Sequence, residues 1–109
     1  MRGTNNVSNS IKKEFDKTEI TKDILELQNI VAMFNTTGFL DRNYAIQKIN
    51  EIRSTNIELV AATALKQAES GTVILQMADN NTIINNVQFQ IDFLTAKLAK
   101  IILEDKRNG

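Results

Sequence analysis

Residues 82–103, TIINNVQFQIDFLTAKLAKIIL, decide the fold, because their apolar side chains recur every three or four positions. One line is spaced alternately three and four positions apart without interruption: Ile84, Val87, Ile91, Leu94, Leu98 and Ile101. This is the a/d repeat of a helix that packs along one seam. Lys106 and Arg107 follow it, where cations favour the helix dipole. The sequence therefore predicts a coiled-coil-like C-terminal helix over about residues 82–106.

The same helix carries a second apolar line, made of Phe89, Phe93, Ala96 and Leu103. At 100° per residue this line lies on roughly the opposite side of the helix from the seam. Burying each Phe fully would contribute about 2–3 kcal/mol, so two such rings are not expected to stay in water. Two interpretations stay open. The line is an interface with a partner or a second copy, or the helix is central and its own chain packs on both sides.

Two further helical segments precede this one. The first is predicted over about residues 18–35 by a 4, 3, 4, 3 spacing of apolar residues, and Gly38 can take the left-handed position after its end. That apolar line is Ile20, Ile24, Leu27, Val31 and Phe34. An extension of this helix towards the N-terminus, through Ile11 and Phe15 in a shifted phase, stays open. The second segment begins near Asp41, a good N-cap, and is predicted to run to about residue 70. Residues 72–78 are expected to continue a neighbouring helix.

The second segment contains one candidate break. Thr55-Asn56-Ile57-Glu58 fits a capping box, in which Thr and Glu three positions apart satisfy each other's backbone donors. The segment is then either one long helix or two helices that meet at Ser54-Thr55.

From Ile57 to Leu65, seven of nine residues are apolar, and only Glu58 and Thr63 are polar. A helix that is apolar nearly all round is typical of a buried one. Several of these residues are alanines, which let another helix approach closely. We therefore expect this stretch to be buried.

These elements predict an all-α fold: a small bundle of three helices, or of four if the chain breaks at Ser54-Thr55. The 109 residues suffice for one domain. Residues 1–10, MRGTNNVSNS, hold one large apolar residue, Val7, and predict a flexible N-terminal tail. The single helical domain is then residues 11–109.

The composition argues against several kinds of chemistry. The chain has no Cys and no His, so it lacks thiolate zinc ligands and the commonest general base. Lys plus Arg count 13 and Asp plus Glu count 13. This zero net charge gives no support to nucleic-acid binding, for which a basic excess is usual, and it favours association.

No motif predicts a catalytic, cofactor-binding or metal-binding residue, and we expect no cofactor and no metal. The Asn-rich turn that starts at Asp79 fails as a calcium loop, because Ile84 and Gln90 stand where Gly and Glu are needed. The four glycines are too scattered to cradle phosphate. The carboxylates that a fold could bring together are Asp16, Glu19, Asp23, Glu26, Glu51, Glu58 and Glu69. Most suit polar helix faces beside Lys, whereas Glu58 is expected to be partly buried as a cap.

The start of the chain, Met1-Arg2-Gly3-Thr4, does not lead into the apolar core of a signal peptide. The most apolar stretch, from Ile57 to Ala78, contains three charged residues and makes a poor membrane span. We therefore predict a cytoplasmic protein without a membrane span. Export by a leaderless route, or after removal of a leader, stays open.

The function predicted from these features is that of a non-enzymatic helical assembly protein. It would bind copies of itself, as a homo-oligomer, or partner helices, through apolar helix faces. The alternative is a small chaperone or inhibitor that sequesters a partner protein, and an enzyme with a carboxylate site is the least favoured. Small, helical, cysteine-free chains of this kind recur among secretion-filament subunits, phage assembly proteins and small chaperones, but no motif assigns this chain to any of them.

The double variant Phe89→Ser with Phe93→Ser tests the second apolar line. If the line is an interface, the variant should associate less while the monomer keeps a cooperative melt. Sedimentation and thermal melts measure the two properties. A double variant that unfolds as a monomer would show instead that both lines belong to the core.

Overall fold

The computed structural model describes the backbone of residues 2–71 and 74–108. The helices are α1 (Arg2–Thr37), α2 (Arg42–Thr55), α3 (Ile57–Ser70), the short 3-10 helix η1 (Leu75–Met77) and α4 (Asn80–Asn108). No strand occurs in this described part of the chain. The all-α prediction is confirmed, and the bundle has four α-helices because the second predicted segment is broken.

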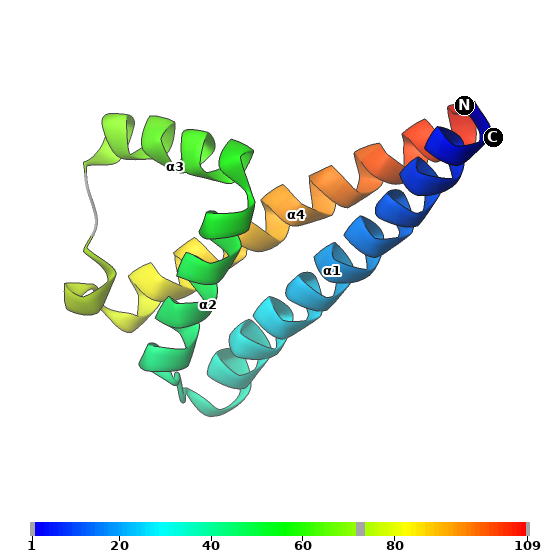
Figure 1. The fold of residues 1–109 in the computed structure, drawn as a ribbon. Coiled ribbons are helices and arrows are strands. Elements are labelled where there is room, and N and C mark those ends of the chain that lie inside the picture. The colour runs from blue at the N-terminus through cyan, green and yellow to red at the C-terminus, as the bar shows by residue number, and fades with distance from the viewer. Residues whose placement is uncertain (1, 72–73, 109) are drawn as a thin grey trace.

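The two long helices, α1 and α4, run antiparallel and side by side, with the start of α1 next to the end of α4 (Figure 1). An ion pair between Lys17 and Asp105 joins them near this end. At the other end, α2 packs across both long helices. From the end of α2, α3 projects as an arm (Figure 1). The molecule is elongated, with extents of 52 × 32 × 21 Å.

The core lies where α1, α2 and α4 meet. Its buried apolar residues are Ile20, Leu27, Ile30, Ala45, Ile46, Ile49, Ile52, Leu59, Leu75, Ile83, Val87, Ile91 and Leu94. The predicted seam of α4 faces this core: Val87, Ile91 and Leu94 are buried, and the other three seam residues pack partly buried against it. A supercoiled, coiled-coil geometry for α4 stays a prediction.

The turn from α1 to α2 follows the predicted signals. Gly38 has φ 74°, a left-handed conformation that suits glycine, and its N–H donates to the carbonyl of Phe34 at 2.8 Å. Asp41 is the N-cap of α2, and its carboxylate accepts a hydrogen bond from the N–H of Tyr44 at 3.1 Å. The predicted start of α2 is therefore confirmed.

The predicted break is present, but a different residue makes it. Asn56 stands between α2 and α3 with an extended backbone, φ −131° and ψ 93°. Its side-chain amide donates to the carbonyl of Ile52 at 2.8 Å, and its side-chain oxygen accepts from the ammonium of Lys97 at 2.9 Å. The Thr55 hydroxyl donates back to α2, so it does not cap α3 and the capping box is not formed.

Helix α1 begins well before the predicted residue 18. It includes residues 2–10, which the composition predicts as a tail. Once a helix has formed, a further residue extends it without the cost of forming a first turn. The apolar repeat gives no sign of an extension through residues 2–10. Independent motion of residues 1–10 relative to a domain of residues 11–109 stays a prediction.

The segment before α4 does not continue a neighbouring helix, contrary to the sequence prediction. Gly71, with φ 95°, ends α3, and residues 72–73 lie outside the described residues. After them Leu75 is buried within η1. The guanidinium of Arg42 donates to the carbonyl of Ala78 at 2.6 Å and to the side-chain oxygen of Asn80 at 2.8 Å. Arg42 thereby joins the start of α2 to the start of α4.

Leu94→Ala should lower the free energy of unfolding by about 2–5 kcal/mol, because the fully buried side chain would leave a cavity in the core. Urea denaturation followed by circular dichroism measures the loss. Leu103→Ala, at a position that is 54% exposed on the same helix, is the matched control and should change stability by less than about 1 kcal/mol. Equal losses in the two variants would contradict this placement of the core.

Candidate protein interface

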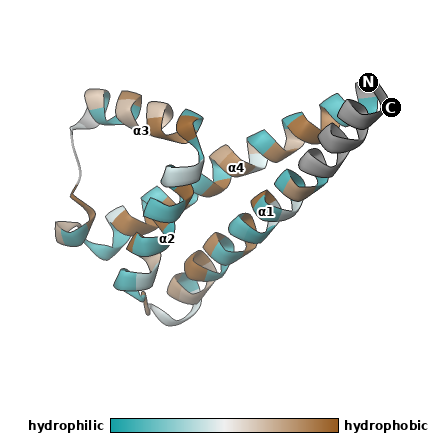
Figure 2. Ribbon diagram, in the orientation of Figure 1, coloured by the Kyte–Doolittle hydropathy of each residue, from teal (hydrophilic) through white to brown (hydrophobic). Residues whose placement is uncertain are grey.

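The largest departure from the sequence prediction is α3, the helix expected to be buried. Among its described residues, 57–69, only Leu59 is buried. Ile57 is 83% exposed, Leu65 is 67% exposed and Val60 is 49% exposed. Hydrophobic residues occupy much of the length of α3 in Figure 2, although the helix lies at the margin of the molecule. The prediction of a buried helix is therefore wrong.

The exposed apolar residues of α3 share one side of the helix. They are Ile57, Val60, Ala61, Ala64, Leu65 and Ala68, and all six are exposed. Their spacing is that of an amphipathic helix, and at 100° per residue they span an arc of about 140° that contains no polar residue. We call this set the α3 stripe. The residues that face the molecule, Leu59, Ala62, Thr63 and Gln67, form a more polar side.

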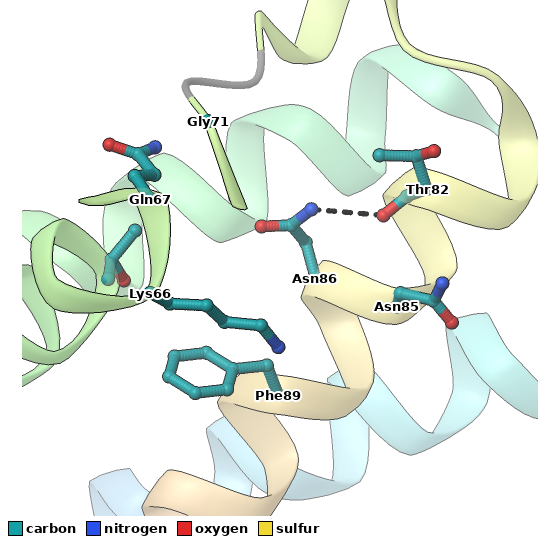
Figure 3. Close-up of a pocket in the computed structure, with 8 residues that line it drawn as sticks. Lys66, Gln67, Gly71, Thr82, Asn85, Asn86 and Phe89 are labelled. Atoms are coloured by element: carbon teal, nitrogen blue, oxygen red, sulfur yellow. Dashed lines mark hydrogen bonds between the residues drawn. The ribbon is translucent and has the colours of Figure 1, made fainter. Parts of the chain in front are cut away.

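Mainly polar contacts hold the arm against α4. At its start, Lys97 of α4 donates to Asn56, and its ammonium lies 3.8 Å from a carboxylate oxygen of Glu58. Further along, the ammonium of Lys66 lies 4.5 Å from the centre of the Phe89 ring, a cation–π distance (Figure 3). Because only Leu59 anchors α3 in the core, the arm is the least firmly packed of the α-helices.

A hollow of about 200 Å³ separates the second half of α3 from the first turns of α4 (Figure 3). Its lining includes Lys66, Gln67, Asn85, Asn86 and Phe89. The side-chain amide of Asn86 donates within α4, to the carbonyl of Thr82 at 3.0 Å. The lining contains no residue of the α3 stripe, so the hollow lies on the inner side of the arm.

The structure splits the second apolar line of α4, predicted as an interface, into two parts. Phe89 and Phe93 are partly buried and pack against the core, as the central-helix interpretation requires. Ala96 and Leu103 are exposed. Binding of a partner by this line stays a prediction. Substitution of both rings by Ser would also remove packing within the chain. A loss of association in that variant therefore indicates an interface only if its thermal melt stays cooperative.

Two of the candidate carboxylates, Asp23 and Glu26, come together on one cation. Asp23 and Glu26 both pair with the buried ammonium of Lys48 from α2, at 3.2 Å in the case of Asp23. Burial lowers the pKa of Lys48, but the hydrogen bonds and the negative charges of Glu26 and Asp23 together raise it by more, so the net pKa lies above its ordinary value. Glu58, expected to be partly buried, has a side chain that is 71% exposed, because α3 is an outer arm.

The Asn-rich turn before α4 serves as a cap. The carboxylate of Asp79 accepts from the N–H of Thr82 at 2.8 Å. Hydrogen bonds from the side chain and backbone of Thr82 hold the pKa of Asp79 below its usual value. No group of three or more acidic residues that could hold a metal ion occurs among the residues that the structure describes.

Within residues 2–71 and 74–108, none of the helices combines the length and hydrophobicity needed to cross a lipid bilayer. Comparisons with protein family models, with curated proteins and with solved structures each give no match.

Lys48→Met should lower the free energy of unfolding by about 1–3 kcal/mol near neutral pH, because it leaves two half-buried carboxylates without their cation. A lysine pKa that is raised on folding adds stability below the ordinary value of 10.5, and the added stability is lost as the pH rises through the folded-state pKa. The gap between the wild type and the variant should thus narrow at alkaline pH. Urea melts across that range measure it, with the exposed Lys100→Met as control, and a gap that stays constant would contradict the prediction.

Proposed function

We propose that the protein is a non-enzymatic helical assembly protein that binds copies of itself, or a partner helix, through exposed apolar helix faces. The observation that carries this proposal is the α3 stripe, six apolar residues on one side of one helix, all exposed. Contiguous exposed apolar patches commonly mark protein interaction sites. The cytoplasmic location and the absence of a nucleic-acid partner stay predictions.

The polar residues of α3 favour a protein partner over a lipid surface. Helices that lie on membranes carry Lys and Arg on their polar face, which attract anionic lipids. Beside the α3 stripe stand two acids, Glu58 and Glu69, and one cation, Lys66. This balance gives no attraction to an anionic bilayer, whereas an apolar helix face of another protein needs no such charge.

The charge balance of the whole chain favours self-association. With 13 basic and 13 acidic residues, two copies experience little net repulsion. The non-enzymatic part of the proposal is supported by the lack of His and Cys in the sequence and by the engagement of Asp23 and Glu26 with Lys48.

Sedimentation of Leu65→Lys over a range of concentrations tests the proposal. The wild type should gain mass as concentration rises. The variant should need about tenfold more protein or beyond to do so, because burying a Leu contributes about 1.5–3 kcal/mol and each 1.4 kcal/mol is tenfold in affinity. Leu25→Lys, at a position 56% exposed on α1, is the matched control and should behave as the wild type. A wild type that stays monomeric throughout would contradict self-association and favour a chaperone or inhibitor.

A further inference from the structure

We infer that the α3 stripe is covered by a second copy of this chain, and that the two α3 helices pair antiparallel about a two-fold axis. This inference rests on the proposed function and names its partner and geometry. The order of large and small residues along the stripe carries it.

The middle of the stripe is the line Ile57, Ala61, Ala64 and Ala68, spaced four, three and four positions apart. This spacing is the same in both directions along the helix. A reversed copy therefore brings Ile57 opposite Ala68, and Ala61 opposite Ala64, at both halves of the pair. Large meets small at the ends and small meets small in the centre, so the helix axes approach closely and evenly.

A parallel pair fits less well. It would bring Ile57 against Ile57 at one end and leave three layers of alanine against alanine at the other. The two Ile57 side chains would hold the helix axes apart at one end, and the alanine layers at the other end would then be poorly packed. The dipoles of two parallel helices also bring like ends together, whereas antiparallel helices place opposite ends side by side.

The flanks of the stripe are compatible with the reversed pairing. Leu65 of one copy comes to lie beside Glu58 of the other, where the aliphatic stem of the glutamate can cover it. On the same flank, Glu58 of one copy comes to about the level of Glu69 of the other, which brings two carboxylates near each other at each end of the pair. Both residues are exposed, so water and salt screen this repulsion. Lys66 stays on the inner side of the arm, over the Phe89 ring.

The position of α3 leaves room for this partner. The arm lies at the margin of the molecule (Figure 1), and its buried residue, Leu59, faces away from the stripe. A two-fold contact uses the same patch on both copies and closes at the dimer. Six side chains per copy cover less than the about 1,600 Å² of a standard stable interface, so we expect a weak dimer that forms as concentration rises.

Cross-linking tests the geometry directly, because the chain has no Cys of its own. Ile57→Cys and Ala68→Cys are made as separate single variants and oxidised alone or as an equal mixture. In an antiparallel pair, like positions lie about 16 Å apart along the axis, at 1.5 Å per residue, and cannot be bridged. The mixture should therefore give about tenfold more covalent dimer than either variant alone. Leu25→Cys mixed with Ala68→Cys measures the background of random collision.

Covalent dimer from each variant alone would overturn the inference in favour of a parallel pair. Concentration-dependent association that persists in Leu65→Lys, without a cross-link in the mixture, would overturn it and leave the proposed function standing with another face as the interface. A wild type that stays monomeric overturns the inference together with the self-association part of the proposed function. A monomer that binds vesicles of phosphatidylcholine and phosphatidylserine overturns both and assigns the stripe to a lipid surface.

Discussion

The packing of α1 against the buried side of α4 positions the rest of the molecule. Leu27 of α1 and Leu94 of α4 are both fully buried, and each contributes about 1.5–3 kcal/mol by leaving water. The antiparallel arrangement of the two helices gives the core its length, and α2 fills the wider end with Ile49 and Ile52. Once these three helices share the core, only Leu59 of α3 finds a place in it.

Polar side chains then fix the shorter elements on this frame. The buried amide of Gln90 donates to the carbonyl of Ile49 at 3.0 Å, between α4 and α2. Arg42 holds the segment that leads into α4, and Lys97 holds the residue where α2 gives way to α3. Each of these bonds satisfies a backbone or side-chain group that would otherwise be costly to bury.

Much of this fold could be predicted from the sequence, and the failures have a common cause. The a/d repeat of α4 identified the side that faces the core, and Asp41 identified the start of α2, because both are local patterns with one physical meaning. The break at residue 55 or 56 was signalled, but its mechanism depends on Lys97, which is distant in the sequence. The burial of α3 was mispredicted because hydrophobic composition shows what a helix can cover, and not whether the core has room for it. The sequence therefore points to Phe89 and Phe93 as the candidate interface and not to α3, whereas in the structure both rings pack against the core and Lys66 of α3 lies over Phe89.

The two sides of α3 differ in what they contribute to the stability of the folded chain. Leu59 lies on the side that belongs to the core, whereas the six residues of the stripe lie on the side that no described part of the chain covers. Substitutions on the outer side should leave the folded chain nearly as stable as before. If the stripe binds as proposed, natural variation at these six positions is free to alter binding specificity, while variation at Leu59 is held back by the need to fold.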